Sequence, residues 1–108
     1  NFTRDSGLRA DIQNNQSTTQ AVFTRAQNDF SSFAIDYSIS RGDAKRIGRI
    51  TASLSEGSNA LSFDDEYNEN ASTGVVLSID ESGSNFSLKY TSTNDVTGHI
   101  HYSLTHLR

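Results

Sequence analysis

Between residues 8 and 33 the chain repeats mostly apolar or small side chains at alternating intervals of four and three residues, which is the spacing of a coiled-coil seam. The seam positions defined by this spacing are Leu8, Ile12, Asn15, Thr19, Val22, Ala26, Asp29 and Phe33. The apolar stripe is too thin to hold an isolated helix together in water. We therefore expect a helix over residues 8–31 that packs against copies of itself, with polar Asn15 and Thr19 setting its register.

The same stretch also fits an amphipathic helix that packs on its own domain. In that arrangement the rings of Phe23 and Phe30 would contribute to the contact as much as the seam does. Both interpretations separate residues 1–31 from the rest of the chain. In the coiled-coil interpretation, which the regular spacing favours, this first unit is the end of an oligomeric stalk.

From residue 32 onward the apolar positions recur every second residue, which is typical of β-strands with one buried face. Six strands are predicted, at residues 33–39, 45–55, 60–63, 74–80, 86–90 and 100–104. Ile47 falls on the opposite face from Ile50, which predicts a β-bulge near Gly48. The sequence thus predicts a mainly β chain, in which an antiparallel β-sandwich knob over residues 32–108 follows the helix.

Composition limits how such a chain can be stabilised. The chain has 108 residues, only 33% of them hydrophobic, with no cysteine and a net charge of −4. A lean core in a small chain needs support, and without cysteine neither disulfides nor thiolate metal sites can supply it, so oligomerisation is the expected stabiliser. The acidic balance argues against a nucleic-acid-binding surface. No Met stands at residue 1, and we expect the chain to be part of a longer protein.

Two short motifs suggest chemistry. Arg41-Gly42-Asp43 is the cell-adhesion tripeptide, but it also fits a hairpin turn with Gly at a positive φ. His99 and His101 alternate on one strand, so both imidazoles should lie on the same side. Two ligands are too few for a closed metal site in one chain, although copies meeting on an axis could complete one. A polar outer face is the simpler interpretation, and no metal or cofactor is predicted.

Other candidate residues lie in predicted loops and clefts. The acidic loop 64–70 and the polar loop 92–98 could contact a receptor, and the residues proposed for this role are Asp64, Asp65, Glu66, Asn94 and Asp95. Clefts between copies could hold a small anion through Arg41, Arg46 and Arg49. No Ser-His-Asp spacing, phosphate loop or dinucleotide motif appears, so we expect no enzymatic activity. A glycan-cleaving enzyme stays open as the least favoured alternative.

Three stretches of the knob read Lys45-Arg46-Ile47-Gly48-Arg49-Ile50, Gly74-Val75-Val76-Leu77 and Asn85-Phe86-Ser87-Leu88-Lys89-Tyr90-Thr91-Ser92-Thr93-Asn94. These stretches resemble the C-terminal head domains of phage tail fibres and needles. The chain as a whole most resembles the distal tip of the tail needle of short-tailed enterobacterial phages. The resemblance covers essentially the whole chain, but similar strands occur in other phage fibre tips.

This resemblance implies a homotrimeric structural protein of the virion tail tip. Upstream parts would join it to other tail proteins. The needle would plug the tail, retain the genome and help to penetrate the host outer envelope during DNA ejection. Knobs of this kind are similar to the jelly rolls of tumour necrosis factor and C1q, although residues 33–108 are short for a full jelly roll. The alternative function is a receptor-binding fibre head that recognises a host glycan or outer-membrane protein.

Overall fold

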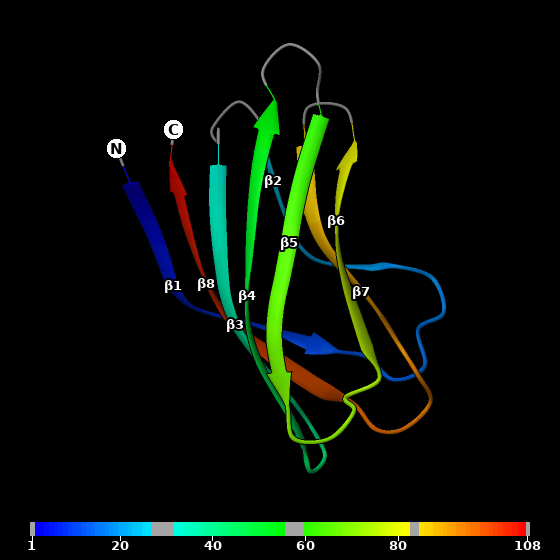
Figure 1. Ribbon diagram of the computed structural model, residues 1–108. Helices are drawn as coiled ribbons and strands as arrows, with labels where there is room; N and C mark the ends of the chain where they lie inside the picture. Colours follow the sequence, from blue (N-terminus) through cyan, green and yellow to red (C-terminus); the bar gives the residue numbers. More distant parts are fainter. Residues whose placement is uncertain (1, 27–31, 56–59, 83–84, 108) are drawn as a thin grey trace.

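The computed structural model describes residues 2–26, 32–55, 60–82 and 85–107, and this part of the chain forms eight antiparallel strands in two sheets (Figure 1). In chain order the strands are β1 (Phe2–Ile12), β2 (Gln20–Ala26), β3 (Ser32–Arg41), β4 (Ala44–Ser55), β5 (Ala60–Glu69), β6 (Val75–Ser82), β7 (Asn85–Ser92) and β8 (Gly98–Leu107). One sheet has the order β1-β8-β3-β4-β5 and the other β2-β7-β6. Strand β8 returns beside the β3-β4-β5 meander, which is a Greek-key arrangement.

The two sheets share one core, to which alternate residues of most strands contribute. The ring of Phe23 on β2 stacks on Tyr102 of β8 with centroids 5.4 Å apart, and Phe33 on β3 stacks on Phe86 of β7 at 4.5 Å. The aliphatic side chains with no exposure are Ile12, Ile35, Ile50, Leu88, Ile100 and Leu104. The mainly β character and antiparallel pairing predicted from the sequence are therefore confirmed.

The predicted helix over residues 8–31 is wrong for the described part of that range. Residues 8–12 end β1 and residues 20–26 form β2, and no helix occurs within the described residues. Leu8, Ala10 and Ile12 also alternate with Arg9 and Asp11, and this period of two places Ile12 in the core. The strand is favoured because β8 supplies a hydrogen-bonding partner on both sides of a register shift between Asp5 and Leu8.

The seam positions accordingly have different surroundings. Ile12 and Phe33 are core residues, Val22 packs at the core margin, and Asn15 and Thr19 lie exposed between β1 and β2. Asn15 has a φ of 56°, which a helix interior does not allow. Asp29 and Phe30, which were assigned to the same helix, lie outside the described residues.

The expected boundary at residue 31 does not separate a stalk from a knob within the described residues. β1 pairs with β8 and β2 pairs with β7, so residues 2–26 belong to the sandwich, and β1 and β8 lie side by side in Figure 1. The described residues contain no helix of the length and apolar character that a membrane crossing requires.

Each of the six predicted strands overlaps one of β3 to β8, although the strand predicted at residues 60–63 covers only the start of β5, and the predicted bulge near Gly48 is wrong. The pairing of β4 with β3 and β5 runs through this position without a shift. Arg46, Gly48 and Ile50 all point to the core side, and Ile47 is simply exposed at the outer face of the sheet, with 67% of its surface accessible.

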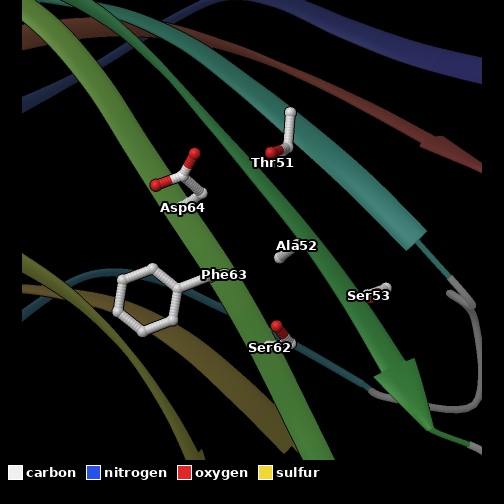
Figure 2. Close-up of a pocket in the computed structure, with 6 residues that line it drawn as sticks. All are labelled: Thr51, Ala52, Ser53, Ser62, Phe63 and Asp64. Atoms are coloured by element: carbon white, nitrogen blue, oxygen red, sulfur yellow. The ribbon is translucent and has the colours of Figure 1, made fainter.

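The wider sheet extends beyond the narrower one at β5. Phe63 and Tyr67 stand opposite the core-facing Ala52 and Gly48 of β4, so they belong to the inner face of the sheet. They nevertheless keep 42% and 53% of their surfaces exposed. Figure 2 shows the Phe63 ring on the side of β5 away from β4, beside a shallow pocket of about 260 Å³. We call the inner face of β5 at these two residues the β5 overhang.

Candidate functional site

One end of the sandwich is organised by the side chain of Arg41, which is only 1% exposed. Its Nε donates to the carbonyl oxygen of Val96 at 2.6 Å, and Nη1 donates to that of Thr73 at 2.9 Å. Its Nη2 donates to Asn14 Oδ1 at 2.9 Å and to the carbonyl oxygen of Thr93. A single guanidinium therefore fixes three segments, residues 13–19, 70–74 and 93–97, which together with the turn at 42–43 we call the loop end.

The acceptors around Arg41 are all neutral. No carboxylate pairs with its guanidinium in the part of the chain that the structure describes. A guanidinium can be buried without a carboxylate partner only when its N–H groups donate hydrogen bonds. Each hydrogen bond from a charged donor contributes about 1.5–3 kcal/mol to stability. Gly42 has a φ of 60° in the turn that follows. The Arg-Gly-Asp triplet is thus a structural turn, with its Arg side chain turned inward where an adhesion receptor could not reach it.

The segments of the loop end also bind one another. Asn14 Oδ1 accepts a second bond, from the backbone N–H of Asp95 at 2.8 Å, and its amide nitrogen donates to Asn94 Oδ1 at 3.3 Å. Ser92 Oγ donates to the Gln13 carbonyl oxygen at 2.6 Å. Asn94 and Asp95, which the sequence placed in a receptor loop, therefore lie exposed on a segment that is held in place.

The other predicted receptor residues do not form a loop. Asp64, Asp65 and Glu66 lie within β5, about the middle of an edge strand, and the structure does not bring them together with Asn94 and Asp95. The run of acidic residues suggested a solvated loop, but the alternation of Phe63, Asp65 and Tyr67 on one face is that of a strand. Asp64 and Glu66 are exposed on the outer face.

Asp65 belongs instead to a network centred on Arg46. Arg46 Nη2 lies 2.8 Å from Asp65 Oδ2, and Nη1 donates to the carbonyl oxygen of Val75 on β6 at 2.9 Å. The Tyr37 hydroxyl donates to Asp65 Oδ1 at 2.8 Å and accepts from Arg46 Nε at 3.1 Å. Burial and the bond to Asp65 raise the pKa of Tyr37. The Arg46 guanidinium also stacks on Tyr67, 3.6 Å from the ring centroid.

These contacts leave little of the predicted anion site between copies, which was assigned to Arg41, Arg46 and Arg49. Arg41 and Arg46 use their donors inside the chain, so neither offers a free guanidinium to a small anion. Only Arg49 is accessible, and it forms a long ion pair of 3.4 Å with Asp36. A sequence pattern could have predicted the burial of these two arginines: Arg41 and Arg46 occupy the same alternating positions as the core residues of β3 and β4.

His99 and His101 lie together on the outer face of the five-stranded sheet, on the same side as the sequence predicted. Their ring centroids are 4.9 Å apart and the rings are perpendicular. They border a depression of about 460 Å³ beside the loop end, which we call the histidine depression. Its other polar lining residues are Ser38, Ser40, Lys45, Arg46, Asn68 and Asn70.

The electrostatics of the histidine depression favour an uncharged His99. Partial burial lowers the pKa of this imidazole, and the charges of Arg9, His101 and Lys45 lower it further, while Asp11 acts in the opposite direction. Among the described residues no group of three or more potential ligands is placed to hold a metal ion. The depression offers hydroxyl, amide, imidazole and ammonium groups, which suit hydrogen bonding to a polar ligand.

Comparison of the chain with protein-family models, curated protein sequences and solved structures found no match.

Replacing Arg41 by Met should reduce the free energy of unfolding by about 3–5 kcal/mol, because several buried carbonyl oxygens lose a charged donor. Urea unfolding measures this loss, and hydrogen exchange should become faster in residues 93–97. Arg41→Lys should be intermediate. The matched control is Arg49→Met, at an exposed position, which should change stability by no more than about 0.5 kcal/mol. A loss below about 1 kcal/mol for Arg41→Met would contradict the role of Arg41.

The lowered pKa of His99 predicts a loss of stability in mild acid. The unfolded chain takes up a proton near the ordinary pKa of 6.5, whereas the folded chain takes it up only at lower pH. The free energy of unfolding should therefore fall as pH decreases below 6.5, and less so in His99→Gln. Unfolding curves on both sides of this pH and an NMR titration of the ring test the expectation. A pKa at or above 6.5 in the folded protein would refute it.

Proposed function

We propose that the chain is the distal tip domain of a trimeric phage tail needle, a structural part of the virion that helps to plug the tail, retain the genome and penetrate the host envelope. The sequence resemblance supports this proposal. Its three stretches fall in β4, at the start of β6 and through β7, which are strands from both sheets. The pairing of β1 with β8 and of β2 with β7 is compatible with the related jelly-roll knobs.

The observation that carries the proposal is the β5 overhang. An aromatic side chain gains stability in proportion to the apolar area that it removes from water, and Phe63 and Tyr67 leave about half of that area exposed. Both residues are on the core-facing side of the sheet, where a second layer would normally cover them. A surface of this kind suits contact with further copies of the chain. The trimer then forms through the sandwich itself, without the coiled coil predicted for residues 8–31.

A receptor-binding head is the second candidate function, and the loop end favours it. Arg41 holds segments rich in Asn, Gln, Ser and Thr in fixed positions next to the histidine depression. Fixed hydroxyl and amide groups reduce the entropy that a loop would lose on binding. This surface is suited to the hydroxyl groups of a host glycan or to a polar patch of an outer-membrane protein.

The mass of the protein in solution tests the first function. We expect about 35 kDa, three times the 11.8 kDa of one chain, in light scattering after gel filtration. Phe63→Ser should shift the protein towards the monomer, because it removes an uncovered aromatic ring from the β5 overhang. Val76→Ser is the matched control, since Val76 is exposed on the other sheet. A wild-type monomer at all concentrations would remove the support for a trimeric tip.

Binding to immobilised outer envelope from the host tests the second function. We expect saturable binding that weakens by at least about tenfold in Asn94→Ala combined with Asp95→Ala, because polar groups at a contact are lost. Thr24→Ala combined with Asp80→Ala, on the three-stranded sheet, is the control and should bind like the wild type. Binding that is unaffected by the loop-end changes would exclude this surface.

A further inference from the structure

The two lateral sides of the sandwich are built differently. Phe23 of β2 stacks on Tyr102 of β8, and Phe86 of β7 stacks on Phe33 of β3. Arg46 of β4 donates to the β6 backbone. The three-stranded sheet therefore covers β8, β3 and β4, and it leaves β1 and β5 as the outermost strands on opposite sides. Within the described residues each of these two strands pairs with only one neighbour, so each has a free hydrogen-bonding edge.

These two sides also differ in charge. The side formed by β5 and β6 carries six carboxylates and no Lys or Arg: Asp64, Asp65, Glu66, Glu69, Asp80 and Glu81. Asp65 and Asp80 are paired with Arg46 and Lys89. The side formed by β1 and β2 carries three arginines against two aspartates: Arg4, Arg9 and Arg25 against Asp5 and Asp11. One side is therefore strongly acidic and the opposite side slightly basic.

The difference in charge between the two sides favours one of two ways in which copies of the chain could associate. A two-fold axis would place the β5 side of one copy against the same side of another, and the like charges would repel. Contact between the β1 side of one copy and the β5 side of the next brings opposite charges together. The carboxylates of β5 thus keep identical edges apart while remaining compatible with β1.

The faces of the two strands match as well. Arg4 and Arg9 are aligned with Thr105 and His101 of β8, which places both arginines on the outer face of the five-stranded sheet. Asp64 and Glu66 are on that same outer face of β5. On the inner face, β1 presents Leu8 and Ala10, which are only partly buried, and β5 presents its overhang. A sheet continued from β5 into β1 would pair charge with charge on one face and apolar side chains on the other.

We propose that copies of the chain associate head to tail, with the β1 edge of one copy against the β5 edge of the next, so that the five-stranded sheet continues between them. The inference rests on the self-association proposed above and names the two surfaces that carry it. β1 has 11 residues, with a register shift between Asp5 and Leu8, and β5 has 10; they run in the same direction, so the added pair is parallel. Head-to-tail contacts close into a ring when the rotation between copies allows it, and three copies would then use all of their edges.

Charge reversal tests the assignment. Asp64→Lys with Glu66→Lys makes the outer face of β5 basic, and Arg4→Glu with Arg9→Glu makes the outer face of β1 acidic. Each pair alone should raise the concentration for half-assembly at low salt by at least about tenfold, because like charges then face each other. The combination of all four changes restores opposite charges and should restore assembly. Asp36→Lys with Asp43→Lys is the matched control, since it changes the net charge equally away from both edges and should assemble like the wild type.

Sedimentation or light scattering across a concentration series reads out assembly, and circular dichroism verifies that each variant is folded. Loss of assembly in both reversed pairs, with recovery in the fourfold variant, supports the proposal. If folded variants with one reversed edge assemble like the wild type, or if the fourfold variant stays apart, the edges are wrongly assigned while self-association stands. If the wild type itself is monomeric, self-association and its edge assignment both fail.

Discussion

The three-stranded sheet is too narrow to cover the five-stranded sheet, and this mismatch determines which side chains are buried and which stay exposed. Within the five-stranded sheet, the covered strands β8, β3 and β4 carry most of the buried aliphatic side chains, including Ile35, Ile50 and Ile100. Of the two outer strands, β1 reaches the core through Ile12, whereas Phe63 and Tyr67 of β5 stay about half exposed, although Arg46 stacks on the Tyr67 ring. Because hydrophobic stabilisation follows the area removed from water, β5 contributes less to the isolated chain than its aromatic content suggests.

Two buried arginines add directional bonds to this lean core. Arg41 and Arg46 occupy inward positions where the alternation of β3 and β4 would otherwise place aliphatic side chains. Each reaches beyond its own sheet, Arg41 to three loop segments and Arg46 to the backbone of β6. Removing a guanidinium from water is costly, and the cost is offset only if its donors find acceptors, which here lie far away in sequence. The same bonds that stabilise the fold therefore also fix the surface of the loop end.

The sequence patterns predicted the structure correctly where the deciding residues are close together in the chain, and wrongly where they are far apart. The period of two after residue 32 predicted β3 to β8, and alternation placed His99 and His101 on one side. Residues 8–12 satisfy a helical and a strand spacing at once, and the deciding factor, the partner β8, lies about ninety residues away. Arg41 is in phase with the core residues of β3, but this phase alone did not predict its burial, because its acceptors come from three separate loops and charged side chains are seldom fully buried.

The position of the proposed contacts has a consequence for binding. The edges of β1 and β5 run along the sides of the sandwich, whereas the loop end lies at one of its ends, with the histidine depression beside it on the outer face of the five-stranded sheet. In a head-to-tail ring whose axis follows the strands, the three loop ends would face the same direction. Weak contacts of each copy with repeated groups on a host surface would then act together, and the avidity could exceed the single affinity by about 10²–10⁴ if the spacing fits. A structural tip and a receptor-binding head are therefore compatible, because the sides would serve assembly and leave the loop end free.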